Sequence, residues 1–294
     1  MAKDVEIVKA RHPLDKQHIK LTYVTHFYCN QGNMDSVESL LKEYESFPDD
    51  IYESFPDDIK DAVEFVIVDD CSPLEYEVKD YDLNFTWLRI TTDIQWNQAG
   101  SRNLGVTYAK SDKIIITDLD CLLPEDTLRY LVNARNPGRS LYRIYRTDEK
   151  TGKAYRGHPN LFFMSRARFF RLYGYDEEFA GHYGSEDYRF VKFHKDHGST
   201  PRYLPKQYRC IERNVDRKKS YHSLDRDLTH NAPIDDRKKN EIALFGAEYG
   251  HSRIFLNFNW EIKKVHSRPP TVPERKVWWR PLWWFRYLFR SLAA

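Results

Sequence analysis

The chain has 294 residues, of which 41% are hydrophobic and 15% aromatic, so it can bury a substantial core in one large domain or two small ones. Its 46 basic and 44 acidic residues leave a formal charge of only +2, which argues against a nucleic-acid-binding protein with a strongly basic body. The chain shows no signal-peptide pattern at its start, and no apolar run approaches the ~20 residues of a membrane span.

The four cysteines are widely spaced, and no two of them form a CxxC pair. They are Cys29, Cys71, Cys121 and Cys210. This spacing argues against a disulfide framework or a zinc knuckle. We therefore expect reduced thiols in a cytoplasmic protein.

Strand patterns alternate with helix patterns along the first half of the chain. The expected strands cover residues 19–27, 64–72, 85–90 and 113–120. The expected helices cover residues 34–47, 97–110 and 124–134, where apolar positions recur at helical spacing. Such alternation predicts an α/β fold with a mostly parallel sheet flanked by helices. Three of the strands end in polar or acidic residues, so we expect these endings to converge on one ligand-binding crevice.

A tandem repeat interrupts this plan between the first helix and the second strand. The sequence YESFPDDI occurs at 44–51 and again at 52–59. The unit is too short for a solenoid, and Pro48 and Pro56 would each break a helix. We predict a duplicated surface loop without a functional role.

The stretch IIITDLDC, residues 114–121, ends a predicted buried strand with two aspartates, Asp118 and Asp120. Residues i and i+2 of extended backbone point the same way, so both carboxylates can face one ligand. Oxygen ligands at this spacing suit Mg²⁺ or Mn²⁺, and such a cation in turn suits a diphosphate. The alternative is a loop in which the two acids only cap the next helix.

A second acid cluster, Glu186 and Asp187, follows Ser185, which is a suitable N-cap residue for a helix that continues through Phe193. The positive end of a helix dipole should keep both carboxylates ionised and able to accept a proton near neutral pH. The alternative is that both acids only favour the helix dipole.

Three segments together resemble GT-A glycosyltransferases, especially the inverting family-two branch and the animal galactosyltransferases. They are VIVDDCSP, WNQAGSRNLGVTYAKSDKIIITDLDC and the block from GYDEEF to GSEDYRF, and the resemblance covers about residues 20–200. It implies a GT-A fold and a nucleotide-sugar-dependent enzyme. One departure is GHYGS, which replaces an aromatic or Trp-Gly-type lead-in to the second acid pair and leaves the mode of acceptor binding open.

The resemblance also implies roles for individual residues. Asp69 and Asp70 would read the base and ribose, and Arg102 and Asn103 would contact the nucleotide or diphosphate. Asp118 and Asp120 match the DxD metal motif, with Asp120 preferred as the direct ligand and Asp118 also counted among the donor-binding residues. Glu186 and Asp187 match the ED pair, whose aspartate is usually assigned as the catalytic base. These assignments belong to the resemblance and do not follow from spacing alone.

The chemistry of glycosyl transfer asks for two separate acid groups. Breaking the bond from an anomeric carbon to a diphosphate develops negative charge on the leaving group, which a carboxylate-held cation stabilises. An ionised carboxylate on the opposite face can take the proton of the acceptor hydroxyl, and in-line attack then inverts the anomeric centre.

A histidine is a plausible third metal ligand. Both His222 and His230 follow the ED pair, and His222 is preferred because KSYHS resembles a strand end.

The end of the chain differs in character from the rest. We expect a catalytic domain over 1–270, with a nucleotide-binding half at about 19–135 and an acceptor-binding half at about 136–270. Residues 271–294 hold VWWRPLWWFRYLFRSLAA, in which Arg286 and Arg290 would share one strip of an otherwise aromatic and apolar helix. Such a segment suits a membrane interface with anionic headgroups. The alternative is a terminal helix packed on the domain or on a partner subunit.

These observations predict an inverting, metal-dependent glycosyltransferase that uses Mn²⁺ or Mg²⁺. It would move a sugar from a nucleotide sugar, a UDP-sugar by preference, to a hydroxyl of a glycan or lipid-linked acceptor. Its expected place is the inner face of the membrane, in surface polysaccharide or glycolipid synthesis, with no nucleic-acid partner. One alternative is a sugar nucleotidyltransferase, although THFYCNQGN lacks the Gly-rich phosphate loop with a basic residue expected there. Another is a non-catalytic carbohydrate-binding protein on the same scaffold.

Overall fold

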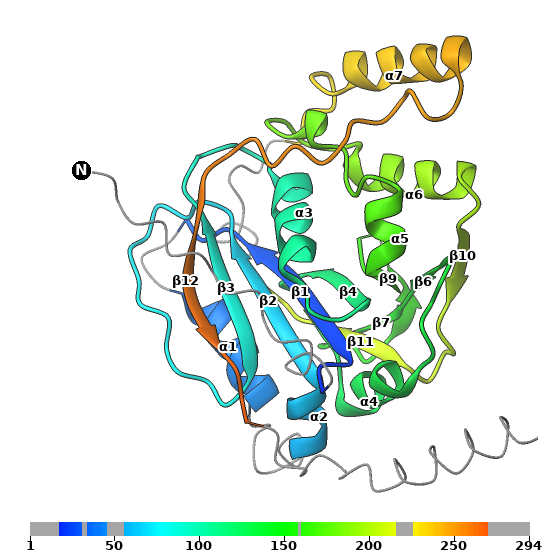
Figure 1. The fold of residues 1–294 in the computed structure, drawn as a ribbon. Coiled ribbons are helices and arrows are strands. Elements are labelled where there is room, and N and C mark those ends of the chain that lie inside the picture. Colours follow the sequence, from blue (N-terminus) through cyan, green and yellow to red (C-terminus); the bar gives the residue numbers. More distant parts are fainter. Residues whose placement is uncertain (1–17, 31–33, 46–55, 158–159, 216–225, 270–294) are drawn as a thin grey trace, which may run out of the picture.

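The computed structural model describes residues 18–30, 34–45, 56–157, 160–215 and 226–269. They form an α/β fold around an eight-stranded sheet with the strand order β10-β6-β9-β4-β1-β2-β3-β12 (Figure 1). The central strands pair in parallel, whereas β9 and β12 run antiparallel to their neighbours. The strands are β1 (Leu21–Phe27), β2 (Val63–Asp69), β3 (Asn84–Ile90), β4 (Lys113–Asp118), β6 (Ser140–Arg143), β9 (Phe162–Ser165), β10 (Thr200–Tyr203) and β12 (Trp260–His266).

The four strands expected from the sequence are all present as β1 to β4. Every residue of β2 and β3 is buried, because helices cover both faces of a parallel sheet of this type. Two strands end earlier than predicted. Strand β2 stops at Asp69, and β4 stops at Asp118, because the chain turns through Leu119 and Asp120 to enter a second sheet.

The second sheet has four short strands in the order β5-β11-β7-β8 and was not predicted from the sequence. Its strands are β5 (Cys121–Leu122), β7 (Tyr145–Asp148), β8 (Ala154–Arg156) and β11 (Arg209–Glu212). Strand β11 ends beside the turn after β4, where the backbone N–H of Arg213 donates to the carbonyl oxygen of Asp120 at 2.7 Å. The second sheet therefore brings distant segments of the chain to the end of β4.

Helices pack on both faces of the large sheet and enclose two hydrophobic cores (Figure 1). Helices α1, α2 and α4 contribute to one core, and α3, α5 and α6 to the other. The helices predicted over 34–47, 97–110 and 124–134 are present as α1, α3 and α4. The complete set is α1 (Asp35–Glu45), α2 (Asp57–Ala62), α3 (Gln98–Tyr108), α4 (Glu125–Asn133), α5 (Arg166–Arg171), α6 (Glu186–Asp196) and α7 (Ala232–Phe245), with a 3₁₀ turn η2 (Glu177–Phe179).

The prediction that the YESFPDDI repeat is wholly a surface loop is wrong at both ends. Tyr44 lies in α1 and is fully buried, and Ile59 lies in α2 with 2% of its surface exposed. Pro56 directly precedes α2, a position at which proline is tolerated because the first turn has no hydrogen bond for it to remove. Residues 46–55 between these ends lie outside the described residues.

The start of α6 also differs from the prediction. Ser185 occupies the N-cap position, but its side chain makes no capping hydrogen bond and its φ is 81°. The side chain of an N-cap residue normally accepts a hydrogen bond from the second or third N–H of the helix while its own backbone is extended. The left-handed backbone of Ser185 does not offer that geometry.

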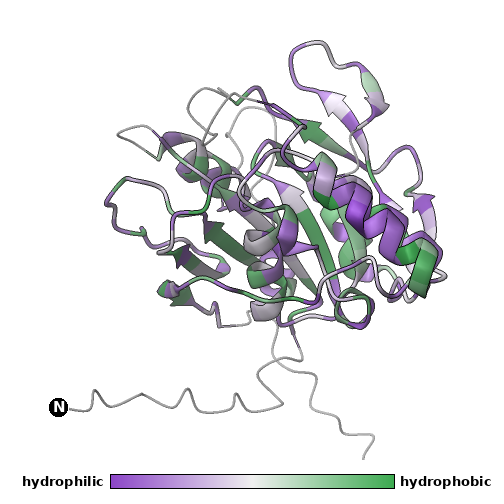
Figure 2. Cartoon of the chain, turned by 90° about the horizontal axis from the view of Figure 1, so that it is seen from above, coloured by the Kyte–Doolittle hydropathy of each residue, from purple (hydrophilic) through white to green (hydrophobic). Residues whose placement is uncertain are grey.

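Helix α7 lies above α6 and is mostly hydrophilic (Figures 1 and 2). Lys238 is its one buried side chain, and it ion-pairs with Asp176 at 2.7 Å and Glu178 at 3.2 Å. Arg189 of α6 also ion-pairs with Asp235 of α7. The helix is therefore held on the domain by charged contacts.

The two predicted halves of the domain share one sheet. Strands β6, β9 and β10 extend it on one side of β4, and β12 returns to pair with β3 at the other edge. All four cysteines are free thiols. Within the described ranges, no helix combines the length and apolar character needed to cross a bilayer. The predicted tail, residues 271–294, lies outside them.

Candidate active site

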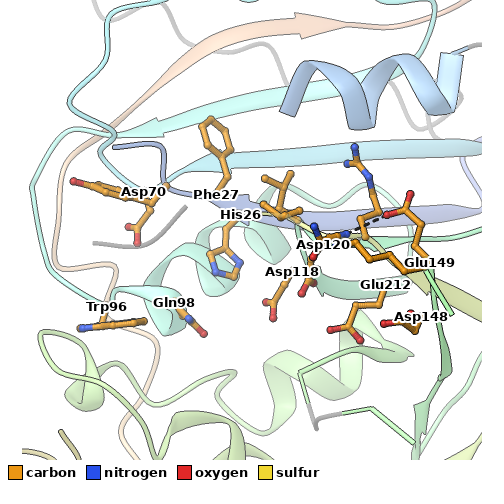
Figure 3. A pocket seen from close by; sticks show the side chains of 16 residues that line it. His26, Phe27, Asp70, Trp96, Gln98, Asp118, Asp120, Asp148, Glu149 and Glu212 are labelled. Carbon is orange, nitrogen blue, oxygen red and sulfur yellow. Dashed lines mark hydrogen bonds between the residues drawn. The ribbon is translucent and has the colours of Figure 1, made fainter. Parts of the chain in front are cut away.

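A cavity of about 260 Å³ opens where β1, β2 and β4 end (Figure 3). The sequence predicted a crevice at these strand ends, and Asp70, Asp118 and Asp120 all line it. Acidic side chains dominate the wall. They are Asp70, Asp118, Asp120, Asp148, Glu149 and Glu212. Lys150 and Arg213 also line the cavity and provide positive charge near the second sheet.

Of the two aspartates that follow the second predicted strand, only Asp70 lines the cavity. Asp69 is fully buried, and its carboxylate accepts hydrogen bonds from the Ser72 N–H at 2.8 Å and the Tyr76 hydroxyl at 2.7 Å. Arg89 lies 3.5 Å from the same carboxylate. Asp69 therefore orders the loop after β2, and this geometry favours a supporting role over contact with a ligand.

Asp70 lines the cavity, and the pKa of its carboxyl is raised. The Asn97 side-chain amide donates to its Oδ1 at 3.3 Å. Burial raises the pKa of Asp70 to about 7, because a charged carboxylate is disfavoured where water is excluded. The side chain can thus accept a hydrogen bond when ionised or donate one when protonated.

The DxD pair, Asp118 and Asp120, lies in the middle of the cavity (Figure 3). Burial opposes ionisation of Asp118, but the guanidinium of Arg102 outweighs it and lowers the pKa of that carboxyl. Burial and the charge of Asp118 raise the pKa of Asp120 to about 6. Two close carboxylates of this kind would both be ionised in the presence of a divalent cation, so their oxygens fit Mn²⁺ or Mg²⁺.

The third metal ligand is not found among the described residues, in which no three His, Cys, Asp or Glu side chains converge as a metal site. The preferred candidate, His222, lies outside them. His230 does not line the cavity. Its ring stacks on that of His182 at 4.2 Å between centroids, and its Nε2 is 3.8 Å from a carboxylate oxygen of Asp227.

Arg102 connects the two acid groups predicted from the sequence. Its side chain is 1% exposed, and its guanidinium donates to Asp118 at 2.6 Å and to Asp187 at 2.5 Å. The cation also lies 5.0 Å from the centre of the Tyr175 ring. Although burial opposes a charge here, these carboxylates keep the pKa of Arg102 above its usual range. Because Arg102 is enclosed by these partners, the geometry favours a positioning role over the predicted contact with the diphosphate.

Asn103 is also fully buried and does not line the cavity. Its amide donates to the Tyr175 carbonyl at 2.9 Å and to Glu177 at 2.7 Å, and it accepts from the Tyr175 N–H at 2.8 Å. These bonds tie α3 to the segment that leads into the ED pair. This geometry favours a structural role for Asn103 over the predicted contact with the nucleotide.

Sequence reasoning missed a second chain of contacts behind the DxD pair. The Asn160 amide donates to the second carboxylate oxygen of Asp118, and its carbonyl accepts from Arg146. The guanidinium of Arg146 lies 3.6 Å from Glu212, another cavity residue. No motif marks Asn160, and the only signal at Arg146 is a charge within a run rich in aromatic and apolar residues.

The ED pair opens α6 as predicted, but the expectation that both acids stay ionised is wrong for Glu186. Burial and the neighbouring charge of Asp187 raise the pKa of Glu186 to about 7. The helix dipole does not offset these two effects. Glu186 is therefore partly protonated at neutral pH, while Asp187 is held against Arg102.

Aromatic side chains lie between the cavity and the loop before α6. Trp96 lines the cavity with a φ of 51°, which is uncommon for a residue other than glycine. The Trp96 and Tyr183 rings meet edge to face, 5.0 Å apart, and Arg226 lies over the Tyr183 ring. Tyr183 belongs to GHYGS, the segment that departs from the family pattern.

Residues 34–198, more than half of the chain, match the family described as Glycosyl transferase family 2. The chain therefore belongs to this family and is a glycosyltransferase with the GT-A fold. No curated protein sequence matches it.

Solved structures are similar in fold at low sequence identity. TarS from S. aureus in complex with UDP-GlcNAc has a TM-score of 0.51 and 12% identity, with 76% of this chain and 65% of that chain covered. The mannosyltransferase PcManGT from Pyrobaculum calidifontis, in complex with GDP-Man and Mn²⁺, has a TM-score of 0.45 and 18% identity, with 76% and 63% covered. A β1,4-galactosyltransferase 7 from Drosophila has a TM-score of 0.38 and 15% identity, with 72% and 78% covered. This chain thus spans less than two thirds of the TarS and mannosyltransferase chains.

Proposed function

We propose that this glycosyltransferase moves a sugar from a UDP-sugar to an acceptor hydroxyl with inversion, and that it requires Mn²⁺ or Mg²⁺. The observation that carries the proposal is the bridge made by Arg102. One buried guanidinium holds a carboxylate of the DxD pair and a carboxylate of the ED pair within 2.6 Å. One side chain therefore joins the acid group suited to a metal, which lines the cavity, to the acid group suited to a proton, which is not among the cavity-lining residues.

The donor would lie across the cavity with its diphosphate at the DxD pair. Asp118 and Asp120 would hold the cation, which stabilises the negative charge of the leaving diphosphate when it is bound. Asp70 would accept hydrogen bonds from the ribose or base, with Asp69 ordering the loop that presents it. Lys150 and Arg213 line the same cavity and would attract the diphosphate in place of Arg102 and Asn103. The UDP-GlcNAc bound to TarS is consistent with a UDP-sugar donor.

Asp187 would act as the general base. Its ion pair with Arg102 fixes the carboxylate relative to Asp118, so the acceptor hydroxyl could lose its proton on the face opposite the leaving group. Attack from that side inverts the anomeric centre. Glu186 is a second candidate because its pKa of about 7 matches the operating range of a general base.

The acceptor would be a glycan or a lipid-linked saccharide at the inner face of a membrane, in surface polysaccharide or glycolipid synthesis. Support comes from the aromatic and basic residues at 277–294, which suit a lipid interface. Membership of glycosyltransferase family 2 favours glycosyl transfer over the nucleotidyltransferase and carbohydrate-binding alternatives.

The test of the proposed function is metal-dependent hydrolysis of the donor. We expect purified protein to hydrolyse one UDP-sugar of a panel slowly when Mn²⁺ is present and to stop when EDTA is added. The Asp120→Ala variant should lose this activity and the metal-dependent thermal shift by the donor, while it keeps a native circular dichroism spectrum. Equal hydrolysis by a folded Asp120→Ala protein would contradict the metal assignment.

A further inference from the structure

A second cavity, of about 420 Å³, lies at the opposite end of the helix that carries the ED pair. Three arginines line it, Arg139 before β6 and Arg168 and Arg171 on α5, together with His197 after α6. We call it the arginine cavity. His197 directly follows the 11 residues of α6, which begin with Glu186, so the two residues lie about 16 Å apart along the helix axis. It is thus distinct from the cavity of the DxD pair.

The positive charges of the arginine cavity are not balanced by the surrounding protein. Within the described ranges, none of Arg139, Arg168 and Arg171 forms an ion pair, and Glu248 is the one acidic residue on the cavity wall. Burial, together with the charges of Arg139 and Arg171, lowers the pKa of Arg168. Arg139 and Arg171 therefore place their charges near Arg168 without a paired carboxylate among the described residues.

A purely structural role accounts for only one of these arginines. Arg168 is 9% exposed, donates from Nε to the Ser199 hydroxyl at 3.0 Å, and donates from an Nη to the His197 carbonyl at the end of α6. Such a contact satisfies a carbonyl that a helix end leaves unpaired. The side chains of Arg139 and Arg171 are exposed, and no hydrogen bond to them occurs among the described residues. They are therefore available to a ligand.

The histidine of the arginine cavity has a spare ring nitrogen. His197 Nδ1 is 2.8 Å from the Phe193 carbonyl, so this nitrogen carries the proton in the neutral ring. The other nitrogen, Nε2, is buried and has no hydrogen-bond partner in the part of the chain that the structure describes.

We propose that the arginine cavity binds a phosphate-type anion. Arginine presents a planar fork of N–H groups that matches phosphate oxygens, and the forks of Arg139 and Arg171 remain available beside the buried charge of Arg168. The phosphate group could be carried by a soluble or glycan-borne phosphate, or by the headgroup of an anionic lipid. The proposal does not depend on the reaction at the main cavity.

The first experiment measures binding of inorganic phosphate to the full chain by calorimetry, with EDTA present so that no cation draws phosphate to the acidic main cavity. Hydrogen bonds from charged donors are stronger than those from neutral donors, so we expect the Arg139→Gln/Arg171→Gln variant to bind phosphate roughly tenfold more weakly or worse. Both arginines are exposed, so the variant should keep the wild-type melting temperature without phosphate. The Arg135→Gln variant, which removes an exposed arginine outside the cavity lining, is the matched control.

The second experiment separates the two sources of the phosphate group. The same proteins are titrated with a water-soluble, short-chain phosphatidylglycerol or phosphatidylcholine, because the aromatic and basic tail would hold any variant on an anionic vesicle. A loss of phosphatidylglycerol binding in the double variant, and not in Arg135→Gln, identifies a lipid headgroup, whereas unchanged lipid binding with weakened phosphate binding identifies a soluble or glycan-borne phosphate. Absence of phosphate binding by the wild-type chain, or equal binding by the wild type and the double variant, overturns the proposal.

Discussion

Arg102 places a buried positive charge between two carboxylates that lie 16 and 85 residues away from it in the chain. Asp118 is held on its other side by Asn160, which Arg146 in turn holds. A carboxylate fixed from both sides presents its remaining lone pairs in a defined direction, and outer contacts of this kind tune metal ligands. The orientation of Asp118 thus depends on Arg102 and Asn160, neither of which is among the cavity-lining residues.

The first prediction concerns Asn160. Replacing it with alanine removes the amide that orients Asp118, and the loss of a hydrogen bond to a metal ligand typically weakens metal binding by about 10–100-fold. We expect such a loss in a Mn²⁺ titration of Asn160→Ala. The control is Asn133→Ala, because among the described residues the Asn133 amide donates only to the Arg129 carbonyl within its own helix. Equal Mn²⁺ affinity in the two variants would show that Asn160 does not support the metal site.

The second prediction distinguishes the members of the ED pair. Asp187→Asn keeps the size of the side chain but removes its ability to accept a proton, so transfer should slow by about 10²–10⁴-fold while donor binding is retained. Glu186→Gln should have a smaller effect on the rate. Both variants are compared by single-turnover transfer and by donor affinity.

The pH dependence of the rate provides the check. Burial and Asp187 raise the pKa of Glu186 to about 7, so Glu186 is neutral below that pH and charged above it. If Glu186 were the base, the rate would rise as pH increases through about 7, and Glu186→Gln would remove both the rise and most of the activity. That result would exchange the roles assigned to the two residues.

At the scale of elements, α7 is held by charge to the segment that precedes α6. Lys238 and Asp176 are each 1% exposed and lie 2.7 Å apart, and Asp176 also accepts from the Ser252 hydroxyl at 2.6 Å. Burial of this kind is unfavourable for either charge without its partner. The segment that leads from Asp176 to the ED pair is thereby fixed by Lys238 of α7 and by Ser252, which follows α7.

The third prediction tests this clamp. Lys238→Met leaves Asp176 buried without its main partner, and breaking a buried pair in this way costs about 3–5 kcal/mol of unfolding free energy. Urea denaturation should show this decrease. Lys239→Met, one position along the helix, removes a side chain that is 55% exposed and should change stability little. Similar midpoints for the two variants would mean that α7 is not held by the buried pair.

At the scale of the whole molecule, the catalytic sheet and the end of the chain have different compositions. The described strands and helices enclose two cores, whereas residues 277–294 combine four tryptophans with arginines. Each aromatic ring buried in a bilayer interface contributes on the order of 1.5–3 kcal/mol, and each arginine near an anionic surface about 1 kcal/mol. These values are sufficient for reversible membrane attachment.

The fourth prediction follows from that composition. A chain without residues 275–294 should no longer co-sediment with anionic liposomes, while it retains transfer to a short soluble acceptor. The full chain under the same conditions is the reference. Equal sedimentation of both chains, or of neither, would indicate that the tail packs on the domain or on another subunit.

The sequence by itself determined the features that depend on local pattern. Alternating strands and helices predicted the α/β fold and the elements β1 to β4, because periodicity over six or more residues is a strong signal. The sequence also predicted that Asp70, Asp118 and Asp120 lie in one crevice, since parallel strands end at the same edge of a sheet.

Only the tertiary structure decided how these groups are held. Strands of two to four residues carry too little periodicity to be predicted, so the second sheet was missed. With it were missed Asp148 and Glu212 at the ends of β7 and β11, and Glu149 in the turn after β7. The bridge of Arg102 and the contact of Asn160 join residues that are distant in sequence, which no local pattern encodes. The pKa of Glu186 rose because burial and a neighbouring charge outweighed the helix dipole, and both effects arise only when the chain has folded.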